Sequence, residues 1–318
     1  MEHAVIERFK SLDEAYLARA PKGDRMYARF AALSSLNSQQ DIETLIEKVF
    51  ETRDQLNEGL GAWRSPARSM RLVFAAALVT AGRSAKHFFD VRKALKDRRK
   101  ARGSRQLSQG GSCAALALIA AGGHAHQVDH FYDNLDAIAA PWWRREPMRE
   151  EILAGAFTAL GETPDECAIR LDRTREALRS AGIPKSHADA AAYEVSLLDT
   201  DYGDIAAAWT SLNLAVRGRS SLRHGVGKTG LAVLAAQGDG SGMADALVRS
   251  FDTLKEMRPR VSSTAAPKIA MRLAQMQMGE TSPVGAASDL AAILAAQAAM
   301  VAAITAASSS AAVATTAT

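Results

Sequence analysis

Apolar residues recur along this chain at intervals of three and four, the spacing that places side chains on one face of an α-helix. The pattern is clearest in a series of small-residue segments, each of which ends in a glycine or another turn-forming residue. These segments end at Asn37, Gly82, Gly122, Gly161, Asp199, Gly238 and Gly279. Successive ends are 45, 40, 39, 38, 39 and 41 residues apart. We therefore expect a helical unit that repeats about every 39 residues.

A second helix with bulkier apolar residues follows each end. After Gly82, for example, Phe88, Val91 and Leu95 are spaced by three and four. Glycine closes a helix readily because it can adopt the left-handed backbone conformation. Each unit is therefore predicted to be a helical hairpin. The predicted N-caps of three second helices are Asp165, Asp204 and Ser241.

The predicted fold class is all-α, with hairpin repeats over residues 1–285. Units of this size build HEAT and armadillo arrays, so we expect an α-solenoid or a closed α/α ring. The spacing does not distinguish between these two. The alternative is a non-repetitive helical bundle in which short loops generate the spacing by accident.

The end of the chain differs in composition, since Asp289 is the one charged residue between Ala286 and Thr318. Alanine is the strongest helix former, so residues 286–307 are predicted to form an Ala-rich capping helix. Residues 308–318 are predicted to be a disordered tail. A membrane span is the alternative interpretation of the helix, but alanine transfers poorly into lipid and Gln297 interrupts the segment.

Composition supports a folded helical protein. Hydrophobic residues make up 47% and charged residues 23%, which argues against wholesale disorder. Aromatics are only 6%, which disfavours a β fold. Cys113 and Cys167 lack the spacing of a metal site and are expected to be buried thiols. The N-terminal segment alternates charges and lacks the apolar stretch of a signal peptide, so we expect a cytoplasmic protein.

Basic residues gather in the connections between hairpins, which would line one edge of a stack. The net charge is only +4, but every one of these connections carries Arg or Lys, with tryptophans among them. The predicted basic-edge residues are Arg64, Arg68, Arg98, Arg99, Lys100, Arg102, Arg105, Trp142, Arg144, Arg145, Lys185, Arg223, Lys228, Arg258 and Arg260.

This edge is a candidate site for a polyanion, whether nucleic acid, an acidic membrane or an acidic protein partner. The indole rings of Trp63, Trp142 and Trp143 could stack on bases or guanidinium groups. The alternative is that basic residues near helix C-termini only complement the helix dipole. That alternative explains the run from Lys96 to Arg105 least well.

A second candidate site is the histidine-rich segment GGHAHQVDHFYD, residues 122–133. His126 and His130 are four residues apart and would share a helical face, a spacing that can hold zinc when a third ligand arrives from elsewhere. His87 and His187 are further candidate ligands. The competing interpretation is a set of surface histidines near a helix start, with no cofactor.

No nucleotide-binding motif is present. The stretch RHGVGKTG around Lys228 resembles a phosphate-binding loop, but the pattern requires a glycine where Leu222 stands. We therefore predict a loop at the start of a helix, and we assign no catalytic residue.

Three segments carry a family resemblance: MRLVFAAAL near Arg71, HGVGKTGLAVLAAQG from His224 and AAQAAMVAAITAAS from Ala295. Through them the chain resembles, over nearly its whole length, an uncharacterised bacterial family, domain of unknown function four thousand and three. The resemblance implies an all-helical fold and supplies no activity or site residue. The function expected from the residues is a scaffold or binding protein, and a metal-dependent enzyme with a site near residues 124–130 is the alternative.

Overall fold

The computed structural model describes residues 2–61, 65–198 and 202–278. Arg64, the segment ends predicted at Asp199 and Gly279, and the predictions for residues 286–318 lie outside these ranges. Within them all regular structure is helical, so the predicted all-α class is confirmed. No helix there is both long enough and apolar enough to cross a bilayer.

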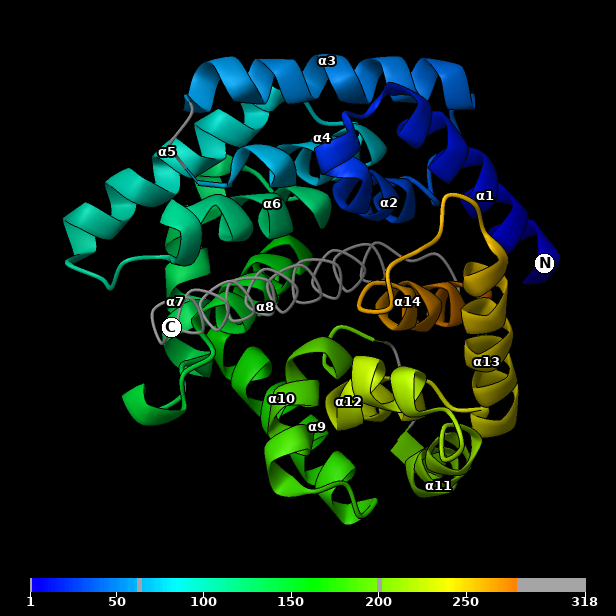
Figure 1. Cartoon of the computed structure of the whole chain (residues 1–318). Helices are drawn as coiled ribbons and strands as arrows, with labels where there is room; N and C mark the ends of the chain where they lie inside the picture. Colours follow the sequence, from blue (N-terminus) through cyan, green and yellow to red (C-terminus); the bar gives the residue numbers. More distant parts are fainter. Residues whose placement is uncertain (1, 62–64, 199–201, 279–318) are drawn as a thin grey trace, which may run out of the picture.

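The described residues form fourteen α-helices and six short 3₁₀ turns (Figure 1). The α-helices are α1 Glu2–Arg19, α2 Arg25–Ser34, α3 Ile42–Leu60, α4 Arg71–Thr80, α5 Ala85–Arg102, α6 Ser112–Ala120, α7 Val128–Ile138, α8 Pro147–Leu160, α9 Pro164–Ser180, α10 Lys185–Val195, α11 Ile205–Ala215, α12 Ser220–Ala235, α13 Gly240–Glu256 and α14 Ala266–Met278. The 3₁₀ turns are η1 Lys22–Asp24, η2 Arg68–Met70, η3 Ser108–Gly111, η4 Ala125–Gln127, η5 Trp142–Arg144 and η6 Tyr202–Asp204.

Glycine closes four of the small-residue helices as predicted. Gly82, Gly122, Gly161 and Gly238 have φ angles of 66°, 95°, 78° and 79° and follow α4, α6, α8 and α12. At this left-handed conformation a Cβ atom would be strained, so glycine is the favoured residue. The helices consequently end where the sequence pattern placed their ends.

The predicted N-caps need correction. The Thr163 side chain caps α9, and Glu166 reciprocates by accepting from the Thr163 backbone N–H at 2.8 Å. The helix therefore starts before Asp165, because this reciprocal capping box fixes its first turn. Asp239 instead of Ser241 caps α13, and the side chain of Asp204 makes no capping hydrogen bond to α11.

Even-numbered and odd-numbered helices have different surroundings. Nine of the ten residues of α4 are buried, whereas α5 buries only Ala85, Phe88, Val91 and Leu95. Small residues let neighbouring helices approach closely: a Cβ atom added to Gly155 of α8 would lie 3.0 Å from the backbone nitrogen of Leu118 of α6. The more exposed α5 presents most of its arginines and lysines away from the core.

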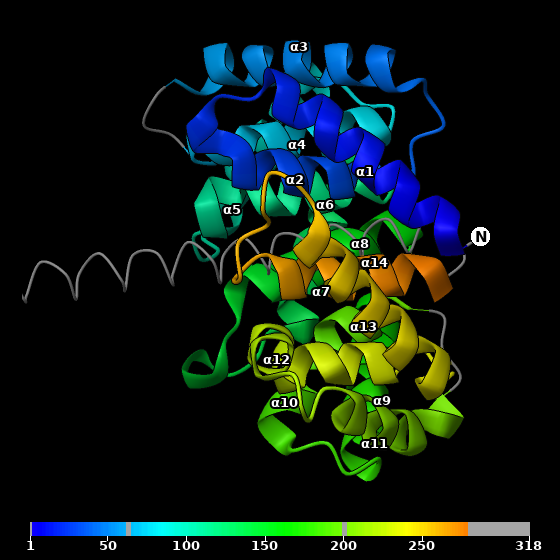
Figure 2. The same ribbon diagram turned by 45° about the vertical axis from the view of Figure 1, so that its right-hand side comes forward.

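Consecutive even-numbered helices contact one another from α2 through α14, and α14 also contacts α1 and α2. Figures 1 and 2 both show α1 beside α13 and α14, so the two ends of the described chain meet. A buried polar contact joins these ends. The Arg29 guanidinium donates a hydrogen bond to the Arg260 carbonyl at 3.0 Å, donates another to the Pro259 carbonyl, and pairs with Asp13 at 3.3 Å.

Candidate functional site

Most of the predicted basic-edge residues within the described ranges are exposed. They lie on helix ends and connections, and the exposed members are Arg68, Lys100, Trp142, Arg144, Arg145, Lys185, Arg223, Lys228, Arg258 and Arg260. The partly buried members are Arg98, Arg99, Arg102 and Arg105. Exposure alone does not make an anion site, so the partners of these cations decide which of them can bind one.

Carboxylates of α7 neutralise two arginines of α5. Arg102 contacts Asp133 at 2.8 Å and Asp136 at 3.1 Å, and Arg98 pairs with Asp129. These carboxylates lie on α7, the second helix after α5 along the chain. The two arginines therefore contribute less positive field to solvent than their number implies.

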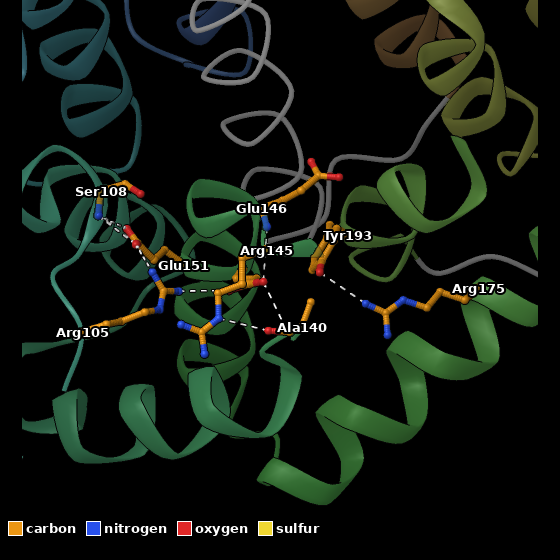
Figure 3. Close-up of polar contacts among 9 residues, drawn as sticks. Arg105, Ser108, Ala140, Arg145, Glu146, Glu151, Arg175 and Tyr193 are labelled. Carbon is orange, nitrogen blue, oxygen red and sulfur yellow. Dashed lines mark hydrogen bonds and ion pairs between the residues drawn. The ribbon is translucent and has the colours of Figure 1, made fainter. Parts of the chain in front are cut away.

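Arg105 is directed into the protein instead of toward solvent (Figure 3). Its guanidinium bridges Glu150 at 3.0 Å and Glu151 at 3.1 Å, and both carboxylates are fully buried. The Ser108 backbone N–H donates to Glu151 at 2.8 Å. Burial raises the pKa of Glu151, while the Ser108 N–H and Arg105 act in the opposite direction. Arg105 thus anchors the connection after α5 onto α8.

Helix-end interactions use two further arginines. Arg258 donates to the carbonyls of Lys255, Glu256 and Met257 at 3.3, 3.1 and 3.0 Å, at the end of α13. The Nε atom of Arg145 donates to the Ala140 carbonyl at 3.0 Å (Figure 3). Arg258 therefore behaves as the helix-end alternative predicts.

Among the cations whose side chains have no partner in the described residues, Lys96 and Arg99 of α5 line the same pocket, which has a volume of about 440 Å³ and lies between this helix and the connection that follows it. The lining residues are Phe89, Arg92, Lys93, Lys96, Asp97, Arg99, Gln106, Leu107 and Gly110. Four are cations and one is a carboxylate, Asp97, which pairs with Lys93 at 2.9 Å. The side chains of Lys96 and Arg99 form neither a hydrogen bond nor an ion pair with any described residue.

An unusual turn forms the far wall of this pocket. Gln109, Gly110 and Gly111 have consecutive φ angles of 48°, 63° and 80°. A Cβ atom at Gly110 would lie 3.2 Å from the Arg92 Nη2 atom, so glycine lets the turn approach this guanidinium. The Gln109 side-chain oxygen is buried without a hydrogen-bond partner. The wall thus depends on a backbone conformation that few side chains tolerate.

A larger pocket, of about 680 Å³, lies between η5, α9 and α10 and has a different charge balance. Three cations and four carboxylates line it. Arg175 pairs with Asp172 at 2.9 Å and donates to the Tyr193 hydroxyl at 3.3 Å (Figure 3), and Arg179 pairs with Asp189. Because carboxylates outnumber the cations and two of the three arginines are paired, this pocket offers no excess positive charge to an anion.

The two histidines predicted as metal ligands do not share an α-helical face. His126 lies in η4, before α7 begins at Val128, and the His130 Nε2 atom donates to the Glu162 carbonyl at 2.7 Å. His124 lies between His87 and His126, with ring centroids 5.5 and 5.7 Å apart. Across the described parts of the chain, no three His, Cys, Asp or Glu side chains are arranged to hold a metal ion.

Lys228 lies within α12, where the backbone departs from helical geometry at Gly227, with a φ of 69°. Its side chain is exposed, and no strand precedes this helix in the described residues. The phosphate-binding loop is therefore lacking in structure as well as in sequence.

Buried charges on the alanine-rich helices were not among the predicted site residues. Glu194 of α10 and Arg272 of α14 are 6% and 4% exposed. Burial raises the pKa of Glu194, opposed by Arg149 and Arg272, and lowers the pKa of Arg272 to about 9, opposed by Glu194. The signal in sequence was a charged residue flanked by apolar residues within each helix. These groups join α8, α10 and α14 electrostatically.

A scan of protein-family models, a search of curated proteins and a search of solved structures each find no match to this chain. The pocket on α5 is therefore assigned from its own geometry and charge.

Proposed function

We propose that this protein is a helical-repeat binding protein that takes up a phosphate-bearing ligand in the pocket on α5. The observation that carries the proposal is the partnerless pair Lys96 and Arg99, which faces a pocket lined by two more cations and a single, already paired carboxylate. Lysine and arginine only donate hydrogen bonds, so the ligand must supply acceptors and negative charge. Phosphate oxygens supply both.

The position of Lys96 within α5 argues against a helix-dipole origin for this cation. The favourable effect of a cation is confined to the last turn of a helix. α5 ends at Arg102, so Lys96 stands more than one turn before its end, as does Arg92, whereas Arg99 lies in the last turn. Arg92, Lys96 and Arg99 follow at spacings of four and three, where like charges repel one another. Repulsion among these three cations destabilises α5 when the pocket holds no ligand. A bound anion would offset that repulsion.

The size of the pocket limits the ligand. Small-molecule sites occupy roughly 300 to 1,000 Å³. A pocket of about 440 Å³ fits a compact phosphorylated molecule or the phosphorylated end of a longer one. The neutralised arginines Arg98, Arg102 and Arg105 make a continuous polyanion track along the whole edge less favourable than one local site.

We also propose that the scaffold is a closed ring of seven helical pairs. The members of each pair are consecutive helices that contact one another: α1–α2, α3–α4, α5–α6, α7–α8, α9–α10, α11–α12 and α13–α14. The contacts of α14 with α1 and α2 support this arrangement over an open solenoid. A closed ring would hold α5 rigidly relative to its neighbours, which favours a preformed pocket.

Isothermal titration calorimetry with tripolyphosphate at low salt tests the binding proposal. The variant Lys96→Gln/Arg99→Gln should weaken binding by roughly a hundredfold, at about tenfold for each charge-assisted contact removed. Lys185→Gln/Lys228→Gln is the matched control, because it removes two exposed positive charges elsewhere and should change Kd less than about threefold. Equal losses in both variants, or no binding by the unmodified protein, would contradict the proposal.

A further inference from the structure

The turn between α7 and α8 exposes two adjacent tryptophans. Trp142 is 78% exposed and Trp143 is 65% exposed, whereas the other exposed large apolar side chains of the described residues stand singly, as at Ile169 and Leu214. Figures 1 and 2 show this connection, green below α7, standing out from the body of the molecule. Two neighbouring exposed indoles on a projecting turn are unusual for a surface that meets only water.

The turn is held in place from beneath. The Glu150 carboxylate is fully buried and accepts from the backbone N–H groups of Ala140 at 3.2 Å and Glu146 at 3.4 Å, one on each side of the turn. The Arg144 N–H donates to the Pro141 carbonyl at 2.8 Å. The two indole rings pack edge to face, with centroids 5.7 Å apart. These hydrogen bonds fix the backbone of the turn that carries the two exposed tryptophans.

We infer that this turn docks the protein on an anionic phospholipid surface. Indole rings favour the headgroup level of a bilayer, where an apolar ring and a polar N–H are both accommodated. Arg144 and Arg145 directly follow the tryptophans and are exposed, so they can reach anionic headgroups beside the inserted rings. The inference goes beyond the proposed function and uses residues outside the α5 pocket.

The ring geometry disfavours single-stranded nucleic acid as the occupant. Stacking on successive bases requires ring faces that lie roughly parallel to one another. The two indoles are instead inclined at 89°. A lipid interface places no such demand on ring orientation, because both rings insert into a fluid layer.

Vesicle sedimentation tests the inference, with phosphatidylcholine vesicles compared with vesicles that also contain phosphatidylserine. The intact protein should sediment with the anionic vesicles, and Trp142→Ser/Trp143→Ser should reduce the bound fraction at least about tenfold. Arg144→Gln/Arg145→Gln should weaken binding only to the anionic vesicles. Ile169→Ser/Leu214→Ser, the matched control, removes two exposed apolar side chains elsewhere and should leave binding unchanged.

Quenching of tryptophan fluorescence by brominated lipids gives a second readout. The brominated lipids should quench the fluorescence of the intact protein, and this quenching should be absent in Trp142→Ser/Trp143→Ser.

Lys96→Gln/Arg99→Gln should still bind vesicles, and the tryptophan variant should still bind tripolyphosphate, so this inference and the proposed function can fail separately. Three results would overturn the inference: no anionic-vesicle binding, equal loss in the control, or tryptophan-dependent binding of an RNA oligomer without binding of vesicles.

Discussion

The Arg29 guanidinium donates a 3.0 Å hydrogen bond to the carbonyl oxygen of Arg260, 231 residues later in the chain. The same side chain forms an ion pair with Asp13, and both groups are buried. Helices α1 and α2 are therefore joined through one cation to the connection between α13 and α14. If the scaffold is a closed ring, this contact lies where the ring closes.

Removing the Arg29 charge should destabilise the protein. Arg29→Gln leaves the Asp13 carboxylate buried without its cation, a change that lowers the free energy of unfolding by about 3 kcal/mol. Arg260→Gln should have almost no effect, because Arg260 contributes its backbone carbonyl and its side chain is exposed. Urea denaturation measures both variants. Equal stabilities for Arg29→Gln and the unmodified protein would show that the contact is dispensable.

The Asp13 carboxyl should make the free energy of unfolding fall as pH rises, whereas a paired surface carboxylate usually makes it rise. Burial raises the pKa of Asp13 from 3.8 to about 6, although Arg29 opposes the rise. Between these values the folded state holds a proton that the unfolded chain has released, so this contribution to stability falls as pH rises and is level above about pH 6. The difference corresponds to about 3 kcal/mol. Unfolding free energies from pH 4 to 6.5 should show this component in the unmodified protein and lack it in Asp13→Asn, whereas parallel profiles would argue against it.

Arg105 should prove structural instead of ligand-binding. Arg105→Gln leaves Glu150 and Glu151 buried without a cation, so we expect a loss of about 3 kcal/mol in unfolding free energy. The already raised pKa of Glu151 should rise further in this variant. Arg99→Gln, in the last turn of α5, should keep full stability and lose ligand affinity. Thermal denaturation and tripolyphosphate titration measure both variants. Lost stability in Arg99→Gln together with lost affinity in Arg105→Gln would contradict this assignment.

Close packing of α6 against α8 predicts a steric effect at Gly155. A Cβ atom there would lie 3.0 Å from the Leu118 nitrogen and 3.2 Å from the Ala114 carbonyl oxygen, backbone atoms that cannot move aside. Gly155→Val should therefore lower the free energy of unfolding by about 3 kcal/mol. Gly23→Ala is the control, because no atom lies within 4 Å of its added Cβ and its stability should change by less than about 0.5 kcal/mol. Comparable losses in the two variants would show that close packing is not the cause.

Local features of the fold could be predicted from the sequence because their causes are local. The glycines at Gly82, Gly122, Gly161 and Gly238 end helices through their own backbone freedom. The N-cap of α9 was misplaced because Asp165 is an acceptable cap by residue type, while the reciprocal contact of Thr163 with Glu166 selects the earlier start. The contact of α1 with α14 depends on the crossing angles of all the helices between them, and no single segment of the sequence determines these angles.

The candidate site was predictable in part. The basic run of α5 is visible in the sequence, but the carboxylates that neutralise Arg98, Arg102 and Arg105 come from the next helical units. Residue spacing therefore identifies the cations and does not reveal which of them remain without a partner. The wall at Gln109 was likewise hidden, since a non-glycine residue in a left-handed conformation has no clear sequence signature.

The most direct test of the proposed binding site is to locate a bound anion. Crystals grown with tungstate, an electron-dense analogue of phosphate, at a concentration near its measured Kd would show the anion by anomalous scattering. We predict a peak within hydrogen-bonding distance of the Lys96 ammonium and the Arg99 guanidinium, and its loss in Lys96→Gln/Arg99→Gln. A peak elsewhere on the molecule, with the α5 pocket empty, would contradict the proposed function.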